Sequence, residues 1–311
     1  MSRLALRGVE DGLTPGARVS GRRVACEHRP VPPHVLLLTF DDPDGHDIET
    51  PGVVAALRAR GATVTVSPWR EPSVTRVPAD VVVIRSTWDY QEHPDEFRAV
   101  LGAFAAPVLN PLDVVGWNLH KSYLLELARA GVPVVPTALV PAGSDEPVPA
   151  VDAPEVVLKP AISANAWGLG RFATGSAEAA DHLRTLTATG DVLVQPYLPE
   201  ILAGERSVVV IGGRVSHAVR KTPAAGEFRV QAEYGGTDTA HTPTAAEIAV
   251  AHAALACVPG GPEALLYARV DLVGPEDAPL LIELELVEPE LFLDLAPGSA
   301  DRFAAALLAR A

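Results

Sequence analysis

Two glutamates near the end of the sequence have the spacing that places side chains on one face of a strand. The stretch PLLIELELV is apolar except for Glu283 and Glu285, and side chains two residues apart on a strand point the same way. Neighbouring carboxylates on a half-buried strand repel each other, so a shared proton, a basic partner or a cation must offset the repulsion. No Lys or Arg lies near these glutamates in sequence.

A third carboxylate comes from the run ARVDLV, which precedes the glutamates. A turn at GPEDAP would pair this run antiparallel with PLLIELELV and place Asp271 beside them. Three oxygen-bearing side chains without His or Cys favour a hard cation, Mg²⁺ or Mn²⁺. The alternative, a solvated edge strand, is less favoured because of Asp271. Ile282, Leu284 and Leu286 are expected to point the other way, into a core.

The basic residues are divided unevenly between their two types. The sequence contains 22 Arg and only three Lys, which are Lys121, Lys159 and Lys221. An ammonium on a flexible stem can touch phosphate oxygens in a narrow pocket where a planar guanidinium does not fit. Lys159 ends the strand-like run VVLKP, and the small-residue loop after it, with Gly168, can fold its amides over a polyphosphate. We interpret the lysines as phosphate contacts; the alternative is a chance remainder in an arginine-rich chain.

Lys221 stands in a basic cluster with Arg220 and Arg229, within SHAVRKTPAAGEFRVQAEYGG. Such a cluster is out of character in a chain with a formal net charge of −14. One interpretation is a lid that brings cations to a transferring phosphate. The alternative is an exposed mobile loop.

The elements expected to hold these residues fall into two groups. From residue 34 to about 116, strand-like and helix-like runs alternate, which predicts an α/β N-terminal domain with a small parallel sheet. Ligands bind beyond the carboxyl ends of such strands, so Arg85 and Asp89 are expected to contact substrate. Trp88 and Tyr90 either join them or pack between domains. The run NLHKSYLLELARAG predicts a helix that ends at Gly131.

The second group is expected over residues 117–311, with a Pro-rich linker at about 141–154. Short β runs dominate after residue 155, and helices are expected near 176–189, 244–257 and 299–310. This order predicts an α+β unit with antiparallel sheets. Residues 1–33 are expected to be a loose leader.

The composition excludes several classes of protein. Hydrophobic residues make up 48% of the 311 residues and charged residues 21%, which indicates a globular chain. The negative net charge argues against nucleic acid or an anionic membrane as partner. Cys26 and Cys257 lie far apart and suggest neither a disulfide framework nor a zinc site. No apolar run is long enough for a membrane span, and we expect a cytoplasmic protein.

In their order along the chain, these motifs resemble the ATP-grasp superfamily over about residues 34–310. The resemblance rests on Lys121, VVLKP and its loop, VLVQPYLPE, AGERS, the lid sequence, ARVDLV and LIELE. It implies ATP-grasp subdomains after the N-terminal domain, with ATP and two Mg²⁺ or Mn²⁺ ions as cofactors. The lid sequence is similar to that of the glutathione synthetase type.

The resemblance also implies roles for individual residues. Lys121 and Lys159 would contact the nucleotide phosphates beside the Gly168 loop, Glu200 or Glu205 would bind the ribose, and adenine would meet the main chain of Gln195, Pro196, Tyr197 and Leu198. Metal ions would be held by Asp271, Glu283 and Glu285, where many family members have Asn in place of Glu285. Arg269 would touch the γ-phosphate, helped by Lys221 and Arg229. Independently of the resemblance, Glu290 is a candidate contact for a substrate amine, although a solvated loop is the favoured interpretation of this acid.

Within the superfamily, RSTWDY, SHAVRK and ELELVEPELFL look most like the cyclo-ligases that close O-ureido-serine to cycloserine in antibiotic biosynthesis. The expected reaction is carboxylate activation through an acyl phosphate, followed by attack of a nitrogen nucleophile. The expected partner is a small amino-acid-like substrate, and a homodimer is compatible with the sequence. The alternatives are an intermolecular amide or dipeptide ligase, a nucleotide-binding regulator without turnover and, less favoured, a phosphotransferase.

Overall fold

The computed structural model describes residues 32–41 and 45–311. The leader expected over residues 1–33 therefore lies outside the described residues except for its last two positions. None of the helices in the described ranges is long and apolar enough to cross a membrane.

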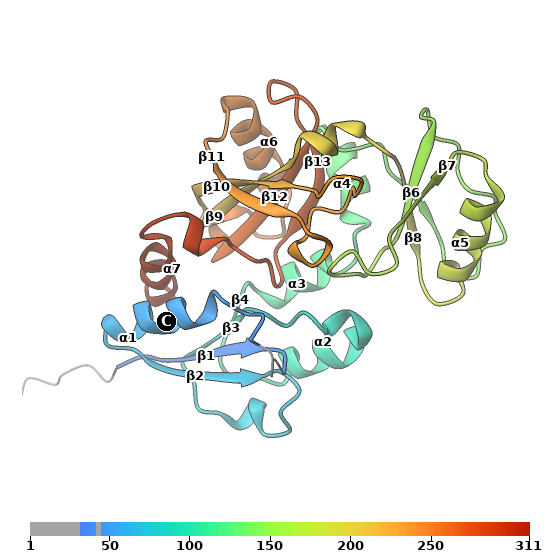
Figure 1. Ribbon diagram of the computed structural model, residues 1–311. Helices are drawn as coiled ribbons and strands as arrows, with labels where there is room; N and C mark the ends of the chain where they lie inside the picture. The colour runs from blue at the N-terminus through green and yellow to red at the C-terminus, as the bar shows by residue number, and fades with distance from the viewer. Residues whose placement is uncertain (1–31, 42–44) are drawn as a thin grey trace, which may run out of the picture. The chain divides into compact units, whose positions relative to one another are not determined.

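A parallel four-stranded sheet forms the first part of the described chain (Figure 1). Its strand order is β2-β1-β3-β4, which confirms the predicted small parallel sheet. The apolar run of β1 is buried because both faces of the sheet are covered. The elements are β1 (His34–Thr39), α1 (Thr50–Ala59), β2 (Thr63–Pro68), β3 (Val81–Ile84), α2 (Pro94–Gly102) and β4 (Val108–Leu109).

The helix predicted over residues 118–131 begins later than expected, and another short helix precedes it. In chain order they are α3 (Leu112–Asn118) and α4 (Tyr123–Arg129). In the turn between them, the backbone N–H of Lys121 donates to the carbonyl of Ala161 at 2.8 Å. The helical spacing of the apolar residues does not reveal this break, because the bond that makes it comes from a distant segment.

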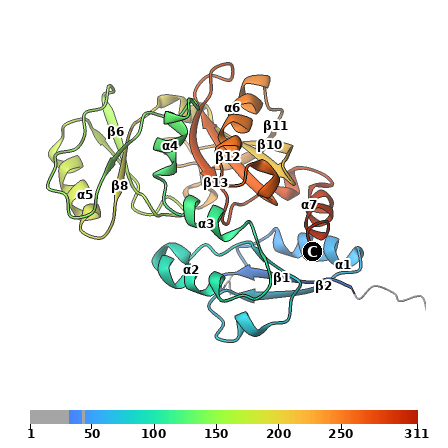
Figure 2. The ribbon, with the colours of Figure 1, turned by 180° about the vertical axis from the view of Figure 1, so that it is seen from behind.

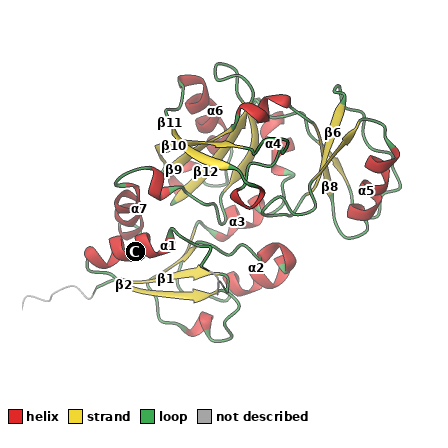
Figure 3. Cartoon of the chain, in the orientation of Figure 1, coloured by secondary structure: helices red, strands yellow, loops and turns green. Residues whose placement is uncertain are grey.

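The middle of the chain forms a small antiparallel sheet covered by one helix (Figure 3). The strand order is β5-β8-β6-β7, and α5 buries Leu183 and Leu186 against Leu158 and Val194 of the sheet. Residues 141–154 contain no helix or strand. The elements are β5 (Ala138–Val140), β6 (Glu155–Pro160), β7 (Gly170–Ala173), α5 (Ala177–Thr187) and β8 (Val192–Pro196).

A larger antiparallel sheet follows, in the order β11-β10-β9-β12-β13. Helix α6 lies against it and shares a buried cluster with its strands (Figure 2). The polar strand β11 had no hydrophobic signal in the sequence. The elements are β9 (Glu205–Ile211), β10 (Arg214–Thr222), β11 (Thr237–His241), α6 (Ala245–Ala256), β12 (Tyr267–Val273), β13 (Leu280–Glu285) and α7 (Ser299–Leu308). Both antiparallel sheets confirm the α+β prediction, whereas the predicted boundary near residue 116 stays a prediction.

Strand β13 contains a bulge that changes the facing of one side chain. The register pairs Asp271 with Glu283 but Leu272 with Leu281, so Ile282 is the extra residue. Leu284 and Leu286 enter the buried core as predicted. Ile282 instead packs against a different buried cluster and lines a cavity together with Glu283, so the prediction that it shares the face of Leu284 and Leu286 is wrong.

Helix α7 returns the end of the chain to its beginning and lies beside α1 in both ribbon views (Figures 1 and 2). Phe303 and Leu307 of α7 share one buried cluster with Val53 and Leu57 of α1. The same cluster contains Tyr267 of β12. The parallel sheet and the five-stranded sheet are therefore joined by a common core.

Candidate functional site

The three lysines of the sequence meet at one cavity of about 340 Å³. Lys121 comes from the turn before α4, Lys159 from the end of β6 and Lys221 from β10. Each is only 6% exposed. A buried ammonium is costly unless it is paired, so these three positions are not surface charges left by chance.

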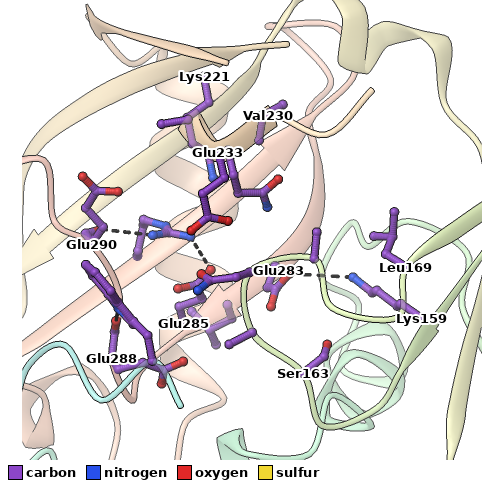
Figure 4. A pocket seen from close by; sticks show the side chains of 18 of the residues that line it. Lys159, Ser163, Leu169, Lys221, Val230, Glu233, Glu283, Glu285, Glu288 and Glu290 are labelled. Carbon is purple, nitrogen blue, oxygen red and sulfur yellow. Dashed lines mark hydrogen bonds and ion pairs between the residues drawn. The ribbon is translucent and has the colours of Figure 1, made fainter. Parts of the chain in front are cut away.

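Of the three predicted carboxylates, Glu283 and Glu285 line the cavity, and Asp271 and Glu283 are paired with the lysines. Lys121 Nζ lies 3.2 Å and Lys159 Nζ 3.7 Å from the Glu283 carboxylate, and Figure 4 shows the Lys159 contact. Lys221 Nζ lies 3.3 Å from Asp271 Oδ2.

Arg269 contributes the fourth cation. It donates to both oxygens of Asp271 and to Glu285, its register partner across the two strands. Acids and bases thus neutralise one another across the floor of the cavity.

Burial and these pairings set the pKa values of the three acids. Burial raises the pKa of Glu285 to about 7, although Arg269 acts against it. Burial would raise the pKa of Asp271 as well, but Arg269 and Lys221 hold it below its usual value. In the same way, Lys121 and Lys159 hold the pKa of Glu283 below its usual value despite burial. Burial lowers the pKa of the Lys159 ammonium. Asp271 and Glu283 are therefore anionic at neutral pH.

The structure does not gather these acids into a metal cluster. Within residues 32–41 and 45–311, no three His, Cys, Asp or Glu side chains lie close enough to hold a metal ion. Asp271, Glu283 and Glu285 lie on adjacent strands, as predicted, and their oxygen-only chemistry suits Mg²⁺ or Mn²⁺. Their role as metal ligands stays a prediction, because each carboxylate is bound to Lys or Arg.

A second cavity of about 100 Å³ adjoins the first. Six of the described residues line both cavities: Lys159, Ala166, Leu169, Val230, Gln231 and Glu283. The remaining lining is largely apolar and includes Val135, Leu198, Ile201, Phe228, Val273 and Ile282.

All four residues predicted to meet adenine, Gln195 to Leu198, lie along the second cavity. The hydroxyl of Tyr197 is buried there, and none of the residues that the structure describes forms a hydrogen bond with it. Glu205 lines the cavity and pairs with Lys221, whereas Glu200 is exposed in the short 3-10 helix Pro199–Ala203. Of the two predicted ribose contacts, Glu205 lines this cavity and Glu200 does not, and the ribose role of each stays a prediction.

The loop between β6 and β7 covers the junction of the two cavities. Asn165 and Ala166 have positive φ angles of 49° and 54°, a left-handed conformation that non-glycine residues rarely adopt. Gly168 is also left-handed, and a Cβ there would lie 2.8 Å from the Pro160 ring. The ammonium of Lys121 donates to the Ser163 carbonyl at 2.5 Å, which anchors the loop beside the lysines.

Three predicted site residues have partners elsewhere in the protein. Arg85 is 3% exposed and pairs with Glu49 at 3.0 Å. Asp89 accepts a hydrogen bond from Trp69 Nε1 at 2.6 Å. Neither Arg85 nor Asp89 lines the cavity. Arg229 lines the second cavity but is bonded to Glu227.

Lys221 is not in a loop: it is a buried residue of β10. The basic cluster in the sequence is therefore divided between a strand and the segment that follows it.

Two side chains that seal the edge of β13 have no recognisable signal in the sequence. Asn118 donates to the Leu284 carbonyl and accepts from the Leu286 N–H, both at 2.8 Å. The hydroxyl of Tyr123 bonds to both backbone groups of Leu284. Both residues lie inside a helical apolar pattern, which hides their polar role, and both line the cavity.

Glu288 and Glu290 form the wall of the cavity opposite Lys159 (Figure 4). Burial raises the pKa of Glu288 to about 8 and that of Glu290 to about 7. Trp88 and Tyr90 line this side too, which favours the first of the two interpretations for them. Among the described residues, no ion pair with Lys or Arg is formed by Glu288 or Glu290.

Comparison with known proteins places this geometry in a family. Residues 35–110 match the model of the N-terminal domain of the D-cycloserine synthetase DcsG, and residues 133–289 match that of the ATP-grasp domain of prokaryotic glutathione synthetase. The second match spans half of the chain, and it contains most of the cavity residues. The chain belongs to the ATP-grasp ligase family.

Individual relatives of this ATP-grasp ligase agree with the family models. The cycloserine biosynthesis protein DcsG of Streptomyces lavendulae is 33% identical over 85% of this chain and 94% of its own. The crystal structure of D-cycloserine synthetase DcsG superposes with a TM-score of 0.77 at 31% identity, covering 89% of this chain and 99% of that one.

A more distant structure supports the fold alone. The D-alanine–D-alanine ligase of Bacillus anthracis superposes with a TM-score of 0.65 at 12% identity, covering 88% of this chain and 96% of that chain.

The family models and the DcsG relatives confirm the predicted family, fold class and enzyme type. This ATP-grasp ligase is a C–N bond-forming enzyme of a family that uses ATP with Mg²⁺ or Mn²⁺.

Proposed function

We propose that this ATP-grasp ligase activates the carboxylate of a small amino-acid-derived substrate and closes it into a ring through its own nitrogen, with O-ureido-serine as the expected substrate. The observation that carries the proposal is the meeting of three buried lysines and Arg269 over the Asp271, Glu283 and Glu285 carboxylates. The substrate assignment is supported by the similarity to the cycloserine biosynthesis protein over most of both chains.

The two adjoining cavities fit a nucleotide. The smaller, mostly apolar cavity suits an adenine ring, with peptide groups of Gln195 to Leu198 at its edge and the free Tyr197 hydroxyl inside. Glu205 then lies where a ribose would follow. The shared residue Lys159 marks the passage to the larger cavity, where the other cations would meet the phosphates. Arg229, at the smaller cavity, would reach the phosphates only after the segment around it closes.

An exchange of partners reconciles the ion pairs with phosphate and metal binding. Phosphate oxygens would replace the carboxylates as partners of Lys121, Lys159, Lys221 and Arg269. Asp271, Glu283 and Glu285, released from those cations, are the residues that would hold the Mg²⁺ or Mn²⁺ ions, for which we propose two sites. The ions supply neutralisation of the charge that develops on the phosphates. The net charge of the cavity floor is low in both states, so neither state leaves buried charges unpaired.

The protein's part in the reaction is mainly positioning and electrostatic stabilisation. A carboxylate oxygen of the substrate bonds to the γ-phosphorus, and the bond to the β–γ bridging oxygen breaks, releasing ADP. Arg269 and Lys221 stabilise the charge on the transferred phosphoryl group. The substrate nitrogen then attacks the activated carbonyl carbon, loses a proton and displaces phosphate.

The wall with Glu288 and Glu290 is placed to receive the cationic end of the substrate. Both side chains line the cavity on the wall opposite Lys159, and they have no Lys or Arg partner among the described residues. An ammonium bound there would lower the pKa of both acids. We propose Glu290 as the contact for the substrate amine. Two separate proposals concern the whole protein: it acts in the cytoplasm, and its N-terminal domain ends near residue 116.

The test is mass spectrometry of the products after incubation with MgATP and O-ureido-serine, with free phosphate measured in parallel. Ring closure with one phosphate released per product supports the proposal. Products that join two amino acids indicate an intermolecular ligase, and a stable phosphorylated product indicates a phosphotransferase. Nucleotide binding without ADP formation across an amino-acid panel would refute turnover and leave a regulator.

A further inference from the structure

Glu49 is a buried carboxylate that does not serve its own helix. It occupies the N-cap position of α1 but forms no side-chain cap bond there. Asp47 does the capping, because its Oδ1 accepts from the N–H groups of Glu49 and Thr50 at 3.2 and 3.0 Å. The side chain of Glu49 is therefore free to serve another part of the chain, although its exposure is only 7%.

The partners of Glu49 lie more than 240 residues away in the wall segment, defined here as residues 288–293. Its Oε2 accepts from the Leu291 N–H at 2.9 Å, and its Oε1 accepts from the Leu293 N–H at 2.6 Å. Between them, Phe292 is left-handed with φ 50°. Successive N–H groups around such a residue form a concavity that binds an anion, and here a protein carboxylate fills it.

Arg85 supplies the counter-charge for Glu49. Its Nη2 lies 3.0 Å from Glu49 Oε2, and both side chains are less than 5% exposed. The guanidinium also lies over the Phe303 ring of α7 at 5.3 Å. Removing one partner of such a buried pair leaves the other uncompensated.

The wall segment carries groups that face the cavity. The carbonyl of Glu288 accepts from Trp88 Nε1 at 3.1 Å, and the carbonyl of Glu290 accepts from Arg269 Nη1 at 3.1 Å. The side chains of Glu288, Glu290 and Phe292 all line the cavity. Fixing the backbone at Leu291 and Leu293 therefore fixes where these three side chains lie.

Arg269 depends less on this anchorage than the wall does. Its guanidinium is also held by both oxygens of Asp271 and by Glu285. Displacement of the wall segment should thus disturb the end of the cavity away from the lysines more than the phosphate end.

We propose that Glu49, with Arg85, is a positioning residue that holds the wall segment in place and thereby sets the affinity for the substrate other than ATP. Neither residue touches that substrate: Glu49 acts through the amides of Leu291 and Leu293. The inference rests on the proposed function for the identity of the second substrate.

The test compares the full-length wild type with Glu49→Gln, Glu49→Asp and the matched control Glu96→Gln. An amide NH₂ at position 49 would face one of the two N–H donors, so one bond becomes a repulsion. Glu96 is an exposed acid of α2 with a surface ion pair to Arg70 at 3.4 Å. Hydrogen exchange of the ligand-free proteins and steady-state kinetics with MgATP and O-ureido-serine give two independent measurements.

We expect Glu49→Gln to raise the KM for O-ureido-serine about tenfold, the effect of one lost charge-assisted hydrogen bond. The KM for ATP and the kcat should change less than about threefold, because the cations at the phosphate end keep their other partners. Glu49→Asp, which keeps the charge beside Arg85, should give a smaller rise. Exchange protection should fall at Leu291 and Leu293 in Glu49→Gln and stay unchanged in Glu96→Gln.

Equal rises in both KM values, or unchanged protection at Leu291 and Leu293, would overturn the positioning role. If Glu49→Gln does not fold, Glu49→Asp decides by the same criteria. A wild type that is inert toward O-ureido-serine counts against the proposed substrate instead. In that event, hydrogen exchange and MgATP affinity of Glu49→Gln decide the positioning role. Loss of exchange protection confined to the wall segment, with wild-type MgATP affinity, supports it. Loss of protection that spreads to the phosphate end refutes it.

Discussion

Replacement of Lys159 by Arg keeps the positive charge and changes only its shape, so it tests whether the site needs a compact cation. Lys159 is 6% exposed at the junction of both cavities, and its Nζ lies 3.7 Å from Glu283. Lys159 lies within β6, and its ammonium shares the Glu283 carboxylate with Lys121, which limits the room for a larger planar group.

The magnitude follows from the contact that would be lost. A hydrogen bond to a charged group contributes about 1.5–3 kcal/mol, which corresponds to a change of about 10- to 150-fold in a dissociation constant. The longer guanidinium also overpacks the junction, at a cost in unfolding free energy of about 1–3 kcal/mol. We therefore expect Lys159→Arg to weaken MgATP binding at least about tenfold while the protein stays folded at 25 °C.

Calorimetric titration with MgATP measures the binding, and a thermal melt checks the fold. The matched control is Arg184→Lys, the reverse exchange at an exposed position of α5 where the side chain is 71% exposed, and it should leave MgATP affinity unchanged. A Lys159→Arg protein with wild-type affinity and turnover would refute the reasoning, because it would show that any positive charge at this position is sufficient.

Three further predictions concern the metal site, the wall and the lid. Glu283→Gln should abolish ATP-dependent turnover, measured as ADP release, in a protein that still folds but melts at a lower temperature, because Lys121 and Lys159 lose their shared partner; undiminished turnover would contradict the metal role. Burial raises the pKa of Glu288 to about 8, so the folded state holds a proton that the unfolded state loses above about pH 4.3. The free energy of unfolding of the wild type should then fall as pH rises toward 8, and that of Glu288→Gln should fall less. Denaturant unfolding without nucleotide or metal measures both, and parallel pH dependences of the two proteins would contradict the raised pKa of Glu288. Gly236→Ala would place a Cβ 2.0 Å from the Val230 carbonyl, so it should destabilise the segment beside the cavity and raise the KM for ATP, whereas Gly190→Ala, with open space around its Cβ, should not.

Much of the site was predictable because it depends on strand periodicity and residue type. The alternation in PLLIELELV and the turn at GPEDAP correctly predicted the pairing of Asp271 with Glu283. The scarcity of lysine correctly singled out three residues that meet at one cavity. Such local signals survive in the sequence because they depend on the chemistry of each side chain and its near neighbours.

The remaining features depend on contacts between distant segments. The bulge that directs Ile282 to a cavity, the break at Lys121 and the sealing of β13 by Asn118 and Tyr123 all involve partners that no local pattern specifies. Arg85 has the sequence position of a substrate contact, at the end of a parallel strand. The structure pairs it with Glu49 instead, because a buried guanidinium needs the nearest available carboxylate.

The sequence by itself determined which chemical groups meet in this protein: three compact cations, paired carboxylates on one strand face and a loop of small residues. Only the tertiary structure decided how these groups neutralise one another and which of them face the substrate end. The physical reason is that the energy of a buried charge depends on the groups that surround it in the folded protein, which are distant in sequence. The Glu49 carboxylate and the Leu291 and Leu293 amides, for example, become partners only when α1 and the wall segment lie together.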